Sequence, residues 1–190
     1  MKKLLVPLFM LALLGFGPYV QQKFNVTPDV QADAAETLTL DVAFDGRTAI
    51  ANLVDPAIKD GARGDTFVVN GKVFPGGAIP PGGTFDQPGT FDPGARGSIG
   101  NFVCRGTMLF DAAEIAAGAA PYVVTNQLFQ LNTGDALLTE GLEAGVNTVR
   151  RAVTGGGGAY SGARGEAQLT LIGINKTGWE NYRFVFTLKN

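Results

Sequence analysis

Hydrophobic and polar residues alternate along most of the chain from residue 37 onward. In 166–174, for example, Ala167, Leu169 and Leu171 are separated by polar residues. A two-residue period places successive side chains on opposite faces, so each such run predicts a half-buried β-strand. The pattern, bounded by turn residues, predicts strands over 37–44, 65–74, 99–110, 122–131, 135–143, 149–154, 166–174 and 181–189.

We expect no long helix between these strands. Only the capping-box spacing of Asp111 and Glu114 predicts one helical turn, over 112–117. Sequential strands joined mostly by short turns can close into a barrel, which leaves no exposed sheet edge. The predicted fold is therefore all-β, an eight-stranded antiparallel up-and-down β-barrel. Such a barrel is just wide enough for a packed interior or for one small ligand.

The glycine-rich segment before the strand at 166–174 predicts a crowded, sharply bent corner. It carries four consecutive glycines, 155–158, followed by Gly162 and Gly165. Glycine tolerates a positive φ and lets backbones approach closely. A phosphate-binding loop is not indicated, because GxxxxGK[ST] is absent and an extended run follows where a helix is required.

The N-terminal segment has the features of an export signal. Lys2 and Lys3 precede an apolar run, Leu4–Phe16, that is shorter than the roughly 20 residues of a membrane-spanning helix. We assign 1–34 to a signal peptide with an A-x-A site at 32–34 or, alternatively, to an uncleaved membrane anchor with a tether. The protein is expected to be exported, either secreted or periplasmic and cell-surface. Contact with a membrane is expected only if this segment stays uncleaved.

The barrel domain is assigned to 35–190, and it contains a long proline- and glycine-rich loop, 75–97. No apolar periodicity survives in this loop, so it cannot form a packed core by itself. Two interpretations remain open. The segment is either a surface loop or a lid over one barrel mouth, with Phe85 and Phe91 tucked beneath it.

Composition narrows the chemistry. The formal net charge of −2 argues against nucleic acid as a partner. The chain has no histidine and a single cysteine, so a Ser-His-Asp set, a Cys-His pair and a zinc cluster are excluded. We expect no cofactor and no metal. What remains is an apolar cavity that orients a reactive substrate with a few carboxylates, tyrosines and arginines.

The segment TGGGGAYSGARGEAQL, residues 154–169, resembles the "GGTG-(aromatic)-xxARG" segment of plant dirigent proteins. It is equally similar to "TGGxGxFEGxxGxVKL" of the allene oxide cyclases, which belong to the same β-barrel superfamily. Further segments resemble family strands in the same order over 37–190, namely 64–69, 100–110, 122–131 and 181–189. The resemblance implies the same barrel, a connecting loop over 47–63, and a homo-oligomer, commonly a trimer or in some cases a dimer.

Both branches act on small, largely apolar molecules. Dirigent proteins steer the coupling or cyclisation of oxidised phenolics, and allene oxide cyclases fold an unsaturated fatty-acid epoxide into a ring. The resemblance therefore implies a small apolar ligand and a cofactor-free cyclase- or isomerase-like activity. The alternative is a non-catalytic barrel that binds a ligand or serves as an assembly module.

Arg164 matches the arginine of the dirigent ARG motif, and Asp41 corresponds to the first-strand glutamate of the cyclases. These two are the candidate catalytic residues. The candidate ligand-binding residues are Asn70, Cys104, Asn126 and Tyr160. The chain departs from the dirigent pattern at Ala159, where an aspartate is expected, and at 70–71, which replace an acidic pair.

Each candidate has a structural alternative. Arg164 would hold the glycine corner, Asp41 would be a solvated strand residue, and Cys104 would be a small core residue. Tyr160 would be a packing anchor, and Asn126 would face water. An arginine and an acid that point into one cavity favour a site, because unpaired charge in a dry interior is costly.

Overall fold

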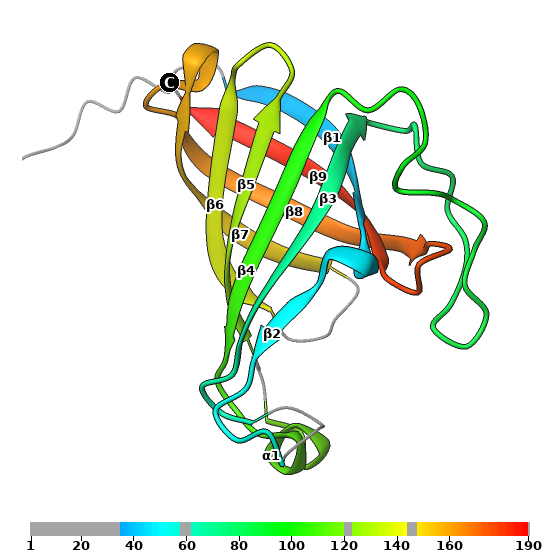
Figure 1. Cartoon of the computed structure of the whole chain (residues 1–190). Coiled ribbons are helices and arrows are strands. Elements are labelled where there is room, and N and C mark those ends of the chain that lie inside the picture. Colours follow the sequence, from blue (N-terminus) through cyan, green and yellow to red (C-terminus); the bar gives the residue numbers. More distant parts are fainter. Residues whose placement is uncertain (1–34, 58–61, 120–122, 144–147, 190) are drawn as a thin grey trace, which may run out of the picture. The chain divides into compact units, whose positions relative to one another are not determined.

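The computed structural model describes residues 35–57, 62–119, 123–143 and 148–189 (Figure 1). The predicted signal or anchor, 1–34, lies outside this part of the chain. The strands are β1 (Glu36–Phe44), β2 (Ile50–Asn52), β3 (Thr66–Pro75), β4 (Gly100–Met108), β5 (Val123–Leu131), β6 (Ala136–Glu143), β7 (Thr148–Gly157), β8 (Arg164–Ile174) and β9 (Glu180–Lys189).

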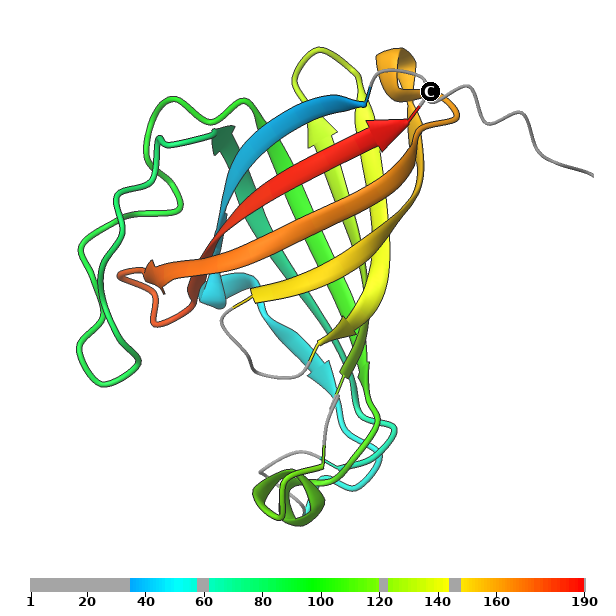
Figure 2. The same ribbon diagram turned by 180° about the vertical axis from the view of Figure 1, so that it is seen from behind.

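The strands follow one another in the order β1-β9-β8-β7-β6-β5-β4-β3-β2, and an additional pairing of β1 with β3 closes the barrel. All strand pairings are antiparallel. Figure 1 shows β3 to β6 side by side, and Figure 2 shows β1, β9, β8 and β7 from behind. The predicted eight-stranded antiparallel barrel is confirmed.

The short strand β2 was not predicted. It lies in 47–63, where we expected only a loop, and it pairs with the first half of β3 through the register Ile50↔Val68. The second half of β3 pairs with β1 instead, from Leu40↔Pro75 to Phe44↔Gly71. The exposed, three-residue β2 carries no alternation of burial, so no periodic signal marked it.

Helical structure is limited to short pieces. These are the 3₁₀ turns η1 (Gly46–Thr48) and η2 (Gly158–Tyr160) and the helix α1 (Ala112–Ala116). The predicted capping box of α1 is confirmed, since Asp111 and Glu114 each accept a backbone N–H from the other at 2.9 Å. Among the described residues, no helix is long and apolar enough to cross a membrane.

Apolar side chains from the inward faces of the strands fill the half of the barrel in which β5 and β9 end. The rings of Phe129 and Phe184 lie 4.9 Å apart, and Phe186 packs edge-on to Phe129 at 5.2 Å. Aromatic pairs of this geometry contribute about 0.5–1.5 kcal/mol beyond the area they bury. This apolar half also contains Leu40, Val73, Phe102, Leu137, Val153, Ala167 and Leu188. It is a packed core.

The glycine corner is as crowded as predicted. A Cβ on Gly156 would lie 2.3 Å from the carbonyl oxygen of Tyr160, and Gly158 has φ +63°. The end of the preceding strand, which we placed at residue 154, was wrong. Gly155 to Gly157 remain extended and form the last part of β7, opposite a register shift in β6.

The proline- and glycine-rich loop lies along the outside of the barrel (Figures 1 and 2). The amide of Gly89 donates to the carbonyl of Ile174 at 2.7 Å, and Gly82 forms a β-bridge with Gly173. Phe91 packs edge-on against Phe74, with ring centroids 5.4 Å apart. The other aromatic residue of the predicted lid, Phe85, is 65% exposed. The contacts therefore favour a loop strapped to the outer wall.

Candidate functional site

The barrel interior changes character towards the end where β6 ends and β9 begins. Inward-facing positions there carry polar side chains instead of phenylalanine. We call five of them the interior polar cluster: Thr125 and Gln127 of β5, Thr139 and Glu143 of β6, and Arg151 of β7. The three strands are neighbours in the sheet, so the side chains meet on the inner wall.

Arg151 is the centre of this cluster. Its side chain is 0% exposed, and its Nη1 donates to Oε1 of Glu143 at 2.6 Å. Nη2 donates to the backbone carbonyl of Thr125 at 2.7 Å, and Nε donates to Oγ1 of Thr139 at 3.2 Å. Burial lowers the pKa of Arg151, and the charge of Glu143 opposes that shift. Arginine stays charged in proteins, so this is a cation held inside the barrel.

Glu143 is the counter-ion, and its donors among the described residues all meet the same oxygen. Oε1 also accepts from Oγ1 of Thr125 at 2.7 Å and from Nε2 of Gln127 at 3.2 Å. Among the described residues, none donates to Oε2. The side chain is 23% exposed, so the carboxylate reaches towards the barrel end while the arginine behind it is sealed.

Local sequence makes room for the arginine. Gly141 lies between Thr139 and Glu143 on β6, and a Cβ there would be 3.2 Å from Cγ of Arg151. The small residue Cys104 of β4 lies in the same part of the barrel wall and is buried. Burial, reinforced by the charge of Glu143, raises the pKa of the Cys104 thiol to about 12. The thiol is therefore protonated at neutral pH.

A second carboxyl group lies near the same end. Glu180, the first residue of β9, shares the two-residue register of the inward-facing Tyr182 and Phe184. Burial raises the pKa of Glu180, and the charge of Glu143 raises it further. A carboxyl group with a raised pKa is a candidate proton donor.

The two predicted catalytic residues are not brought together. Asp41 is fully buried, but it lies on the outer face of β1, where Arg183 donates to Oδ1 at 2.8 Å and to Oδ2 at 3.0 Å. Oδ2 also accepts the amides of Gly77 and Ile79, at 2.9 and 3.0 Å. Its visible role is to fasten the long loop to the barrel.

Arg164 is exposed and binds the glycine corner. Its Nη1 donates to the carbonyl of Ala163 at 2.8 Å, as in the structural alternative for this residue. Tyr160, in η2, is half-buried and packs against the apolar core, and burial raises its pKa. These contacts give both residues structural roles at the end of the barrel opposite the interior polar cluster.

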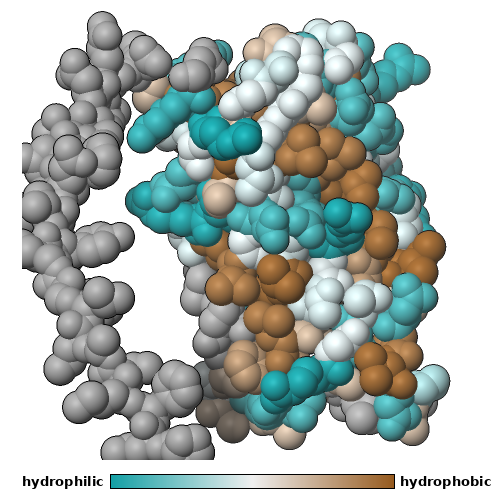
Figure 3. Space-filling view, turned by 90° about the vertical axis from the view of Figure 1, so that its left-hand side faces the viewer, coloured by the Kyte–Doolittle hydropathy of each residue, from teal (hydrophilic) through white to brown (hydrophobic). Residues whose placement is uncertain are grey.

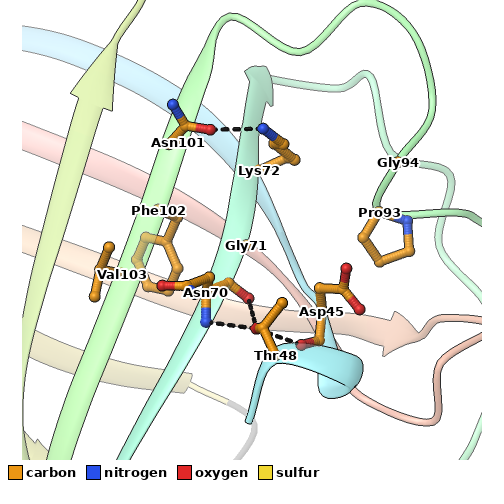
Figure 4. Close-up of a pocket in the computed structure, with 10 residues that line it drawn as sticks. All are labelled: Asp45, Thr48, Asn70, Gly71, Lys72, Pro93, Gly94, Asn101, Phe102 and Val103. Carbon is orange, nitrogen blue, oxygen red and sulfur yellow. Dashed lines mark hydrogen bonds between the residues drawn. The ribbon is translucent and has the colours of Figure 1, made fainter.

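Asn70 and Asn126 face outward. Asn70 lies on the rim of a hollow of about 380 Å³ on the outer wall, drawn in Figure 4. Two polar contacts border this hollow: the backbone N–H of Asn70 donates to Oγ1 of Thr48 at 2.9 Å, and Lys72 donates to Oδ1 of Asn101 at 2.6 Å. Of the predicted ligand-binding residues, only Cys104 lies beside the interior polar cluster.

Sequence reasoning missed Glu143, Arg151 and Glu180. Glu143 and Arg151 could have been found from the parity of their positions, that is, from which residues share a strand face at i, i+2 and i+4. In a strand that alternates apolar and polar residues, the phenylalanines and leucines mark the inner face. Glu143 shares the parity of the buried Leu137, and Arg151 shares that of Val153. Polar residues at inward positions are the exception that marks a site.

The arrangement limits the chemistry. Within the described part of the chain, no group of three or more acidic, cysteine or histidine residues is placed to hold a metal ion. The interior polar cluster holds a sealed cation, a carboxylate with one oxygen that no described residue donates to, and a nearby acid of raised pKa. It can bind a polar group of a small molecule and exchange protons with it.

No family model matches the chain, and no curated protein matches it either. Solved structures do. A pyocyanin demethylase is similar with a TM-score of 0.53 at 15% identity, covering 81% of this chain and all (100%) of its own. A pterocarpan synthase dirigent protein gives 0.53 at 13% identity, covering 90% of this chain and 98% of its own. A second pterocarpan synthase dirigent protein gives a TM-score of 0.53 at 13% identity, covering 81% of this chain and 94% of its own.

At these identities the similarity establishes the fold. The chain has the closed barrel of the dirigent-type proteins, so the resemblance noted in the sequence is confirmed at that level.

Proposed function

We propose that this dirigent-type barrel binds a small, largely apolar molecule that carries one polar group, and that it orients this molecule for cyclisation or coupling. The polar group would meet Glu143 and Glu180 at the end of the barrel where β6 ends and β9 begins. The observation that carries the proposal is the interior pair of Arg151 and Glu143. A buried charge is costly in a barrel that only needs to fold.

The geometry of Glu143 supports binding. Three donors hold Oε1 in place, so Oε2, to which no described residue donates, is oriented without further loss of side-chain freedom. A ligand hydroxyl that donates to a fixed, partly desolvated carboxylate forms a charge-assisted hydrogen bond. Glu180, with its raised pKa, is suited to deliver a proton to a developing oxyanion or alkene. Such chemistry needs neither a metal nor a covalent intermediate.

The proposal is tested by native mass spectrometry of the purified protein after exposure to phenolic and lipid extracts, followed by calorimetry with the retained compound. Glu143→Gln is expected to weaken binding by at least about tenfold, because a hydrogen bond to a charged group contributes about 1.5–3 kcal/mol. The matched control is Glu166→Gln, which removes the same charge from the outward-facing, exposed pair of Arg150 and Glu166.

Glu180→Gln provides a second variant, since Glu180 has no ion pair among the described residues. It is expected to retain the ligand but to slow its conversion. Equal binding by wild type and Glu143→Gln would contradict the interior site. If neither extract yields a retained ligand, the result favours the alternative, a non-catalytic barrel that serves as an assembly module. Export by the segment 1–34 stays a prediction, checked by intact-mass measurement of the secreted form.

A further inference from the structure

The outer face of β4, β5 and β6 carries a row of polar residues bordered by apolar ones. Arg105, Asn126 and Glu140 lie opposite one another in the register of the three strands. The next outward-facing row on the side of the glycine corner consists of Val103, Leu128 and Leu138. The next row on the opposite side consists of Thr107, Val124 and Leu142. β4, β5 and β6 face the viewer in Figure 1. Figure 3 views the molecule from the left-hand side of Figure 1, next to β6, and shows apolar patches between polar ones on that side.

The apolar side chains protrude and the surface beside them is hollow. Leu138 is 42% exposed and Leu142 is 49% exposed, both on β6. A hollow of about 270 Å³ lies next to Val103 and Leu128, and one of about 310 Å³ lies next to Thr107 and Val124. Arg105 and Asn126 line both hollows. The first hollow extends across the sheet from Val103 to Leu138, and the second lies on the β4 side of the face, away from the leucines of β6. The face therefore carries both projecting apolar side chains and hollows.

The charges are complementary in the same sense. Arg105 and Glu140 flank Asn126 on opposite sides, and neither takes part in an ion pair among the described residues. A two-fold axis along β5, in the plane of contact, exchanges the positions of β4 and β6. It brings Arg105 of one copy over Glu140 of the other, twice. The same operation places Leu138 over the hollow at Val103, Leu142 over that at Thr107, and the two Asn126 amides together.

We propose that this face is the interface of a two-fold symmetric dimer of the chain, with a reciprocal Arg105–Glu140 pair on each side of Asn126. An isologous interface requires a self-complementary patch, and charge, shape and register all meet that requirement about one line. The sheets would pack face to face with their strands roughly aligned, as twisted sheets do. The inference does not depend on what binds inside the barrel, because these side chains point away from it.

Sedimentation velocity of the purified protein over a range of concentrations tests the proposal by charge exchange. Arg105→Glu and Glu140→Arg are each expected to weaken the dimer about a hundredfold, since each places two like-charged pairs in the contact. The double variant with both changes should restore the dimer, because an acid at position 105 then faces an arginine at position 140 of the other copy. Restoration is expected only if each residue meets the other across the axis.

Leu142→Asp tests the shape component and should give a monomer. Phe85→Asp, which alters an exposed apolar side chain on the long loop, is the control and should leave the dimer intact. Circular dichroism of each variant checks that the barrel is folded. A wild type that is monomeric or trimeric would overturn the proposal, as would a double variant that stays monomeric.

Discussion

Two arginine–carboxylate pairs in this barrel are buried in opposite senses. In the outer pair the acid is sealed and the cation is accessible: Asp41 is 0% and Arg183 33% exposed. In the inner pair the cation is sealed and the acid is accessible: Arg151 is 0% and Glu143 23% exposed. Both pairs have similar distances, 2.8 and 2.6 Å, so distance alone does not distinguish a fastening from a site.

The difference lies in what is left open. Both oxygens of Asp41 are occupied, by Arg183 and by two loop amides, and the accessible member of that pair is an arginine. Glu143 keeps one oxygen free of described donors and presents it towards the barrel end. A saturated acid stabilises the fold, whereas an acid held from one side can still bind something else.

The largest effect is expected when the inner cation loses its partner. Glu143→Leu leaves Arg151 buried and unpaired, which costs about 3–5 kcal/mol. The double variant Glu143→Leu with Arg151→Met should recover most of this loss, because an apolar replacement of a buried pair is often neutral. Urea unfolding of the two variants and the wild type measures both values. Equal stability of the single and double variants would contradict the assignment.

The outer pair should respond less and should not recover. Arg183→Met leaves Asp41 with its two backbone donors, so we expect a loss of about 2 kcal/mol. Adding Asp41→Leu should destabilise further, because the amides of Gly77 and Ile79 then lose their acceptor. The same unfolding experiment tests this. A recovery like that of the inner pair would remove the distinction between them.

Glu180 adds a pH dependence to the inner site. Its pKa in the folded protein is above the ordinary 4.5, because of burial and the charge of Glu143. Between these two values the folded state binds more protons than the unfolded state, so the free energy of unfolding falls as pH rises through this window. Each pKa unit corresponds to about 1.4 kcal/mol. Glu180→Gln cannot ionise, so it should lack this fall and exceed the wild type at higher pH.

The measurement is urea unfolding of both proteins at a series of pH values. Identical slopes against pH would show that Glu180 is solvated.

The smallest effect is expected at Arg164. Its contacts are backbone carbonyls on an exposed surface, so Arg164→Gln should cost less than about 1 kcal/mol and leave ligand binding unchanged. Calorimetry with the ligand checks the second point. A loss of binding would restore the role that the sequence resemblance gave to this residue.

The period-two pattern was sufficient to predict the barrel, since most inward-facing residues of the strands are apolar and alternate with outward-facing ones. It was less informative about the site. Asp41 was selected as an acid in the right strand, but its side chain lies on the outer face, opposite to Leu40 and Val42. Asn126 likewise has the outward parity of β5. Reading parity strand by strand would have moved attention to Thr125, Gln127 and Arg151.

Other features were not accessible from a single chain. The pairing of Asp41 with Arg183 joins residues separated by 142 positions, and no local pattern encodes such a distance. The strand β2 and the packing of the long loop depend on which edge of β3 remains uncovered, and this is decided only when the barrel closes.

The pairing of β1 with β9 has a consequence for the order of assembly. β1 has eight residues in register with β9, from Glu36↔Leu188 to Ala43↔Asn181, but only five with β3. Since β9 is synthesised last among the described strands, most of the hydrogen-bonding partners of β1 are absent until residues 180–189 have been made. A chain stopped before Glu180 would keep two unpaired edges and should be held open. Late closure of this kind is compatible with transport of the chain in an unfolded form, and it predicts slow, non-local folding.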